Sequence, residues 1–337
     1  MKKTLAIIFF GILLLYFIGP TPNTPEYNSD LPAIPSISEV ENYVENKEST
    51  FDIKPGNKAE IVWVDTSNKT KTDVAIVYLH GFTASPEEGS PIHREIAKRF
   101  GCNLYLARLS EHGLDTEEAL LNFTAEGLWE SAKEAYAIGK RLGKQVIIMS
   151  TSTGGTLALK LAATHPEIKG LINYSPNIEI NDPAAFLLND PWGLQIARLV
   201  FKGDYRTVES DEDYRKYWYD KYRLESIVQL QELVETAATE RTFKNVTCPV
   251  FNGVYYKDEN HQDNTVRVDA IRRMHEELGT TGDQKQLIEF PDAGGHVIAY
   301  GKQSGAVDGV RKATIEFLEQ KVGLSQNPGS RENSKRD

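Results

Sequence analysis

The sequence predicts an α/β fold, in which a mostly parallel, twisted sheet carries helices on both faces. Short apolar runs of strand length alternate along the chain with longer helical stretches. The run 74–79, VAIVYL, is apolar throughout, which is typical of a strand buried on both faces of a parallel sheet. Strands that alternate with helices at this spacing form sheets covered on both sides.

Composition and charge are those of a globular protein that does not bind nucleic acid. The chain has 337 residues, of which 40% are hydrophobic and 26% charged, so a sizeable core can form. A net charge of −10 argues against nucleic acid as a partner, because that ligand needs a basic face. Cys102 and Cys248 each lie beside an apparent strand, and we expect two buried thiols with no disulfide.

The N-terminus carries an apolar run. Lys2 and Lys3 precede about fifteen uncharged residues that end at Gly19, long for a signal-peptide core and short for a membrane span. No small-residue cleavage site precedes Pro20. We therefore expect residues 1–19 to be an uncleaved membrane anchor, with the rest of the chain exported. Cleavage of a signal peptide, followed by secretion, is the alternative.

Proline density and the apolar pattern divide the rest of the chain. Residues 20–48 are expected to form a proline-rich tether and a first helix, residues 49–323 the folded domain, and residues 324–337 a disordered tail. Strands are expected at 50–53, 61–64, 74–79, 104–109, 146–149, 171–174, 250–256 and 286–290, and helices at 36–46, 93–100, 125–142, 226–237 and 266–278.

One segment, 178–245, interrupts the alternation. It lacks a convincing strand and is rich in aromatic residues. An insertion of this size between two sheet strands is interpreted as a helical lid over a pocket, because pockets form at such junctions. A helical layer that only packs against the core is the alternative.

The stretch 145–157, QVIIMSTSTGGTL, carries the strongest chemical signal. An apolar strand runs into five small residues and then into a helical pattern. A serine exposed on such a strained strand-to-helix turn requires small residues two positions before and after it, and Ser150 and Gly154 hold those positions around Ser152. Ser152 is therefore the candidate nucleophile, and a flexible loop is the alternative interpretation.

A serine nucleophile needs a histidine base that is itself oriented by a carboxylate. In this fold the order along the chain is serine, acid, histidine, and four histidines follow Ser152. His165 ends a helix, and His275 is expected to be solvated on an amphipathic helix. His296 follows the last expected strand in a glycine-rich loop, so it is the candidate base.

The acid is expected in the loop after the preceding strand, where Asp258 is nearest the strand and Asp263 nearest the next helix. With Glu259 and His261 these residues could suggest a metal site, but one histidine and no known ligand spacing disfavour it. We expect neither a metal nor a cofactor.

Two backbone amides are expected to stabilise charge on a substrate carbonyl. One is the N–H of Thr153, directly after the candidate nucleophile. The other is the N–H of Phe82, in the loop that follows the run 74–79. His80, in the same loop, is expected to brace it and to take no part in the chemistry.

Together these motifs resemble the α/β-hydrolase superfamily, on the side of bacterial carboxylesterases and monoacylglycerol-lipase-like enzymes, the group also labelled serine aminopeptidase S33. The resemblance runs from Val74 to Leu318 and is carried by LHGF, EHG, STSTGG, QDNTV and GGHV. Relatives mostly have glycine where this chain has Ser150 and Glu111. In similar hydrolases a valine two or three residues after the acid starts the next helix, which favours Asp263 over Asp258.

The resemblance implies a serine hydrolase that cleaves a carboxylic ester, lipid-like or of medium chain length, through an acyl-enzyme on Ser152. The expected partners are a small-molecule ester and, through the N-terminal run, a membrane. A peptidase or acyltransferase on the same scaffold is one alternative, since the same three residues serve all acyl transfer. A catalytically inactive binding module is the other.

Overall fold

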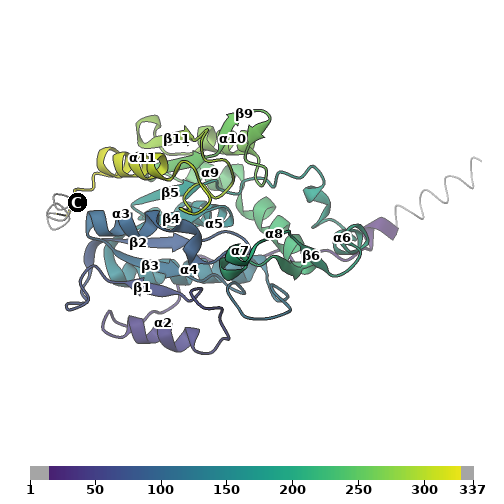
Figure 1. Ribbon diagram of the computed structural model, residues 1–337, viewed down its shortest axis with the longest axis horizontal. Helices are drawn as coiled ribbons and strands as arrows, with labels where there is room; N and C mark the ends of the chain where they lie inside the picture. The colour runs from purple at the N-terminus through teal and green to yellow at the C-terminus, as the bar shows by residue number, and fades with distance from the viewer. Residues whose placement is uncertain (1–14, 328–337) are drawn as a thin grey trace, which may run out of the picture.

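A computed structural model describes residues 15–327 of the chain and shows the mostly parallel sheet that the sequence predicts (Figure 1). The strand order is β1-β3-β2-β4-β5-β8-β11. Only β1 is antiparallel to its neighbour, and the other neighbouring pairs are parallel. The strands are β1 (Glu60–Val62), β2 (Thr72–Leu79), β3 (Asn103–Ala107), β4 (Gly143–Thr151), β5 (Gly170–Tyr174), β8 (Val250–Val254) and β11 (Lys285–Glu289).

The strand order changes direction at β2, which has β3 on one side and β4 on the other. In open α/β sheets the ligand site lies at such a switch point, beyond the carboxyl ends of the strands. The loops that follow β2 and β4 are the two that the sequence assigns to the oxyanion donors and to Ser152. The topology therefore brings these two loops to one edge.

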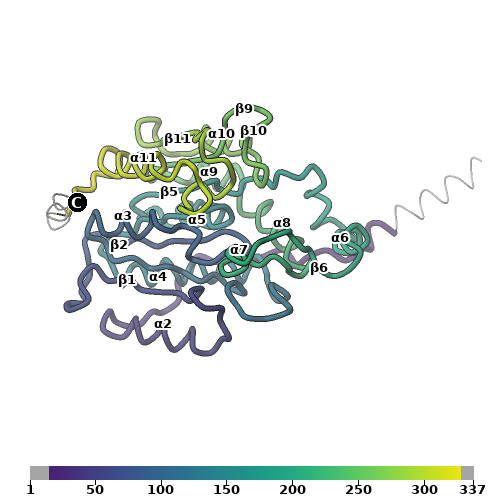
Figure 2. The backbone as a smooth tube through the Cα atoms, viewed as in Figure 1, coloured from purple at the N-terminus to yellow at the C-terminus, as the bar shows by residue number. Residues whose placement is uncertain are grey.

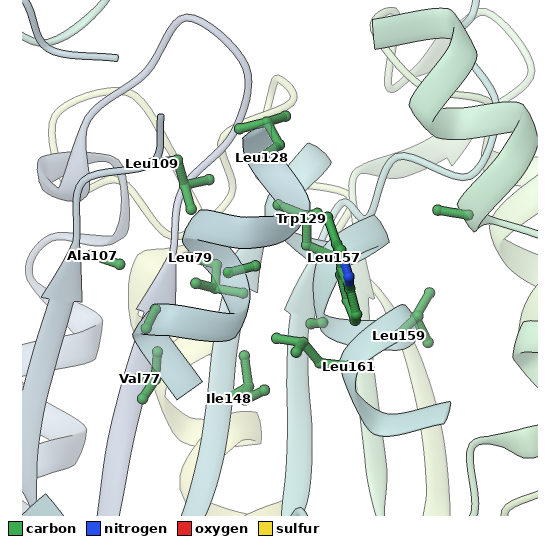
Figure 3. Packing of buried hydrophobic residues seen from close by; sticks show 14 of the residues in the cluster. Val77, Leu79, Ala107, Leu109, Leu128, Trp129, Ile148, Leu157, Leu159 and Leu161 are labelled. Atoms are coloured by element: carbon green, nitrogen blue, oxygen red, sulfur yellow. The ribbon is translucent and has the colours of Figure 1, made fainter. Parts of the chain in front are cut away.

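Side chains of alternate residues in β2 supply two hydrophobic cores. Val77 and Leu79 join the larger core with α4 and α5, as Figure 3 shows for Leu128, Trp129 and Leu157. Ile76 and Tyr78 face the opposite layer. The helices of the first face are α4 (Ala125–Leu142), α5 (Thr153–Thr164), α8 (Leu224–Ala237), α9 (Glu240–Asn245) and α10 (Val268–Glu277), and those of the second are α3 (Ile92–Phe100) and α11 (Val307–Gln320).

Some expected elements differ in the structure. The strand expected at 50–53 is wrong, since only Ile53 forms an isolated bridge, to Leu114. The strand expected at 250–256 divides after Val254, and its continuation β9 (Tyr256–Asp258) pairs with β10 (His261–Gln262) in a separate hairpin. The first helix, α2, covers Val40–Glu48. Cys102 and Cys248 are buried free thiols, as expected.

The inserted segment, residues 178–245, lies between β5 and β8 and has two parts. Its second part, α8 and α9, belongs to the larger core. Its first part holds α6 (Gly193–Phe201), α7 (Glu212–Tyr217) and a small antiparallel sheet of β6 (Tyr205–Thr207) and β7 (Lys221–Arg223). The expectation that the segment contains no strand is therefore wrong in this detail, although neither strand joins the main sheet.

The proline-rich stretch 20–35 has no helix or strand and lies partly on the folded domain. Trp129 and Lys133 of α4 donate hydrogen bonds to the carbonyl oxygens of Asn28 and Asp30, at 2.8 and 3.0 Å. At the other end, residues 15–18 lie beside α6 (Figure 2), where the Trp192 indole donates to the Leu15 carbonyl oxygen at 3.0 Å.

Within residues 15–327, none of the helices has the length and apolar character needed to cross a bilayer. Most of the expected anchor, residues 1–14, and residues 328–337 of the expected tail lie outside the described residues.

The close approach of α5 to β2 depends on Gly154. A Cβ at this position would lie 2.1 Å from the Leu79 carbonyl oxygen and 2.8 Å from that of His80. Both contacts are with backbone atoms, so a larger residue would force α5 away from the end of β2.

We predict that Gly154→Ala lowers the free energy of unfolding by about 1–3 kcal/mol, the usual cost of overpacking a close-packed interior. Gly203→Ala is the matched control, because a Cβ there meets nothing within 4 Å. Urea unfolding of both variants checks this. Equal stability of the two variants would contradict the assigned role of Gly154.

Candidate active site

Ser152 lies at the turn between β4 and α5 with φ 53° and ψ −120°, a strained conformation for a residue with a side chain. Its N–H donates to the Tyr174 carbonyl oxygen at 3.0 Å, and its own carbonyl oxygen accepts from Gly155 and Asn177 at 2.8 and 2.9 Å. These bonds hold the strained backbone in place. Ser150, the small residue two positions earlier, is fully buried and donates to the Asn173 side-chain oxygen at 2.8 Å.

His296 and Asp263 lie together although 33 residues separate them, with 2.7 Å between His296 Nδ1 and Asp263 Oδ2. Asp263 is fully buried, and its other oxygen accepts from the N–H groups of Thr265 and Val266 at 2.9 and 3.1 Å. Ser175 Oγ donates to the His296 carbonyl oxygen at 2.8 Å. With Nδ1–H bound to the carboxylate, Nε2 is left as the basic nitrogen.

Asp258, the alternative acid, lies elsewhere. It sits at the end of β9, where its carboxylate is half exposed and pairs with His261 Nδ1 at 2.8 Å. The β9–β10 hairpin turns these two residues into solvent. After the hairpin the chain returns, and the Asp263 N–H donates to the Tyr255 carbonyl oxygen at 3.0 Å. The structure therefore brings Asp263, and not Asp258, against His296.

The surroundings of Asp263 and His296 favour a charged carboxylate and a basic imidazole. Burial alone would lower the pKa of His296, but the charge and hydrogen bond of Asp263, with a further contribution from Glu88, raise it above the ordinary value of 6.5. Burial also acts to raise the pKa of Asp263, and its bonds to His296 and to two backbone N–H groups reverse that effect and lower it. Asp263 is thus ionised at neutral pH.

The two expected oxyanion donors line the same cavity as Ser152 and His296. Within residues 15–327, the amides of Phe82 and Thr153 donate to no backbone or side-chain acceptor. Such amides are available to bind a developing negative charge. His80 braces the loop that contains Phe82: its Nδ1–H donates to the Gly81 carbonyl oxygen at 2.8 Å, and its Nε2 accepts from the Leu109 N–H at 3.0 Å.

The cavity has a volume of about 550 Å³. Polar groups surround Ser152 at its base. The inserted segment supplies mainly apolar and aromatic side chains: Leu188, Tyr214, Trp218, Tyr222, Ile227 and Leu230. A neighbouring groove of about 810 Å³, between α8 and α10, contains none of the candidate catalytic residues.

Two other histidines after Ser152, His165 and His275, contact residues outside the candidate site. His165 packs against Tyr136, with ring centroids 5.1 Å apart. The expectation that His275 is solvated is wrong: it is half-buried, and its Nδ1 lies 3.1 Å from the Asn252 side-chain nitrogen. Burial lowers the pKa of His275 to about 4. No group of three or more potential ligands in residues 15–327 is placed to hold a metal ion.

Sequence reasoning missed one residue of this cavity, Glu88. It lies on the short turn Pro86–Gly89, is only 2% exposed and lines the cavity with Ser152 and His296. Nothing in the local sequence indicates this burial, because adjacent glutamates between a proline and a glycine are typical of a solvated turn.

Comparison with known proteins agrees with the fold. No protein-family model matches the chain. A thermostable monoacylglycerol lipase from Bacillus sp. (strain H-257) is 28% identical over 220 residues, which cover 64% of this chain and 80% of the relative. This chain has the fold of the α/β-hydrolases.

Solved structures of α/β-hydrolases have the same fold. A structure reported for the metagenome-derived lipolytic enzymes LipS and LipT matches with a TM-score of 0.60 at 17% identity, covering 80% of this chain and 99% of that one. The monoacylglycerol lipase of Paleococcus ferrophilus matches with a TM-score of 0.57 at 17% identity, covering 77% and 97%.

We predict that Asp263→Asn lowers kcat by about 10³- to 10⁴-fold with little change in KM, because the carboxylate fixes the imidazole tautomer and stabilises its cation. Asp258→Asn is the matched control and should leave both constants near wild type. Steady-state kinetics on a soluble ester checks this. A crippling Asp258→Asn with a mild Asp263→Asn would show that the other aspartate is the acid.

Proposed function

We propose that this protein is a serine esterase that cleaves carboxylic esters through an acyl-enzyme on Ser152. One observation carries the proposal: Ser152 on its strained turn and His296, which is paired with the buried Asp263, line the same cavity. The named activities of the Bacillus relative and of the structural neighbours support ester hydrolysis as the reaction class.

The proposed reaction has two halves, formation of the acyl-enzyme and its hydrolysis, and the same groups act in both. His296 Nε2 takes the proton of Ser152 as the serine oxygen attacks the ester carbonyl. The amides of Phe82 and Thr153 bind the resulting oxyanion. Collapse of the tetrahedral intermediate breaks the ester bond, and His296 returns the proton to the departing alcohol. Water then attacks the acyl-enzyme as His296 takes its proton; the bond between the acyl carbon and Ser152 breaks, His296 returns the proton to the serine oxygen, and the carboxylic acid is released.

The acyl group is proposed to be of medium chain length or lipid-like. The inserted segment covers the cavity with aromatic and aliphatic side chains, which suits a long apolar chain. We propose that its first part, from α6 to β7, acts as the lid. The second part, α8 and α9, packs in the core and forms a fixed wall.

The protein is proposed to work at a membrane, with residues 1–19 as the anchor and the catalytic domain on the exported side. The exposed apolar side chains next to this segment support the proposal. Leu199 and Val200 on α6 are 80% and 68% exposed, and Phe17 and Ile18 beside α6 are 69% and 67% exposed. Large apolar residues that gather on one end of a protein mark an interaction surface, and a lipid surface fits the apolar sequence that precedes Leu15.

We predict that Ser152→Ala abolishes both covalent labelling by a fluorophosphonate and hydrolysis of p-nitrophenyl esters, because the attacking oxygen is gone. Thermal unfolding should show that the variant is folded. Thr151→Ala serves as the neighbouring control in the same turn. Hydrolysis that survives Ser152→Ala would refute the proposed function. In wild type, acetyl esters preferred over longer acyl esters would count against a lipid-like substrate.

We predict that fractionation finds the full-length chain in membranes, and that a chain beginning at Asn28 is released to the soluble fraction. Removing the apolar run removes most of the membrane affinity. Recovery of full-length protein cleaved after about Gly19 would refute anchoring.

Substitutions on α6 distinguish the contribution of this exposed helix to membrane binding from that of the anchor. Leu199→Asp with Val200→Asp in the full-length chain should slow hydrolysis of esters presented in vesicles, while hydrolysis of soluble esters stays unchanged. Lys202→Asp at the end of the same helix controls for added negative charge.

A further inference from the structure

Glu88 is a buried carboxyl group that the triad and oxyanion donors leave unexplained. Its side chain is 2% exposed, and a carboxylate is costly to bury unless it is well paired. No lysine or arginine within residues 15–327 forms an ion pair with it. A group kept in such a position at the base of the cavity calls for a role in the site.

The contacts of Glu88 reach the oxyanion loop. Its Oε2 accepts from the Gly81 N–H at 2.6 Å. Gly81 directly precedes Phe82, the proposed oxyanion donor. A Cβ built on Gly81 would lie 3.0 Å from both Glu88 Oε1 and the Cβ of Ser152. The Glu88 carboxyl group and Ser152 are therefore both packed against Gly81 of the oxyanion loop.

Glu88 also links that loop to the inserted segment. Trp218 lines the same cavity and lowers the pKa of this carboxyl group, and Trp218 is itself buried between Tyr214 and Tyr300. The next residue, Tyr219, donates its N–H to the Thr83 carbonyl oxygen at 2.9 Å. The position of the Phe82 amide thus depends on how the segment after α7 docks.

We propose that Glu88 is a positioning residue of the catalytic site: its carboxyl group holds the oxyanion loop through Gly81, and its negative charge supports the protonated form of His296. The proposal rests on the proposed function, since it needs His296 to act as the base for Ser152. It assigns no bond-making step to Glu88.

The electrostatics of the surrounding groups agree with this role. Burial raises the pKa of Glu88 to about 7, against the lowering effects of the Gly81 N–H, His296 and Trp218. The other titratable side chains that face it are Tyr78 of β2 and Tyr214 of α7, and burial raises the pKa of both, so they stay neutral. Glu87 is its neighbour on the same turn, and Asp263, like Glu88, raises the pKa of His296.

The sign of the pH effect follows from the charge. His296 must be neutral to accept the proton of Ser152, so kcat/KM rises with pH through the pKa of His296. An ionised Glu88 favours the imidazolium and moves this acid limb to higher pH. Removing the charge should therefore move the limb to lower pH. A residue with only a packing role would leave it in place.

The test compares Glu88→Gln, Glu88→Leu and the matched control Glu87→Gln in the full-length protein, with p-nitrophenyl butyrate and a fluorophosphonate as probes. Glu88→Gln keeps an acceptor for Gly81 but loses the charge, so its acid limb should shift down by about half a pH unit or more while plateau kcat stays within several-fold of wild type. Glu88→Leu loses the acceptor as well, and kcat should fall about 10-fold or more with KM within twofold. Glu87→Gln should match wild type in both.

An acid limb of Glu88→Gln that superimposes on that of wild type would overturn the electrostatic role, and an unchanged kcat in Glu88→Leu would overturn the bracing role. If Glu88→Leu unfolds, the pH profile of Glu88→Gln still tests the electrostatic role. The pH dependence of fluorophosphonate labelling gives the same limb without any assumption about substrate. Failure of the proposed function is distinct, because it would appear as activity or labelling that survives Ser152→Ala.

Discussion

The parallel pairing of β2 with β4 is the constraint on which the site depends. Its register sets Leu79 opposite Ser150, so the loop that contains Phe82 and the turn that contains Ser152 leave the sheet at the same level. Gly154 completes the arrangement, because the Leu79 carbonyl oxygen occupies the space that a side chain would need. The loops after β8 and β11 reach the same edge because their strands are parallel to these two, and they bring Asp263 and His296.

Two buried carboxyl groups flank His296, and their surroundings give them opposite properties. Asp263 accepts from two backbone N–H groups as well as from His296, and its pKa is lowered in spite of burial. Glu88 has fewer donors, and burial raises its pKa to about 7. Pairs of acids with divergent pKa values are a common means of separating roles within one site. The bonds to Asp263 favour its charged form, whereas burial of Glu88 favours its neutral form.

The inserted segment combines two physical roles that sequence patterns present as alternatives. Its α8 is as deeply buried as the sheet helices, with Leu224 and Leu233 fully buried, so it cannot leave the core without a large loss of apolar burial. Its α6 instead exposes apolar residues beside the N-terminal residues 15–18. The part between α6 and β7 is the proposed lid, and just before β7 the Tyr219 N–H donates to Thr83 of the oxyanion loop.

Local patterns were sufficient to determine the parallel sheet, most of its strands, the small-residue turn around Ser152 and the place of His296 after the last strand. These features are encoded by contiguous residues whose period or size decides the backbone. For the acid, both aspartates lie in one short loop, and only the valine pattern of similar hydrolases favoured Asp263 over Asp258. The tertiary structure decided which of them lies against His296, since the β9–β10 hairpin turns Asp258 outward before the chain returns. Glu88 was invisible in the sequence because its burial depends on Trp218 and His296, which are more than a hundred residues away along the chain. Such proximity is a property of the folded chain, and no local pattern can express it.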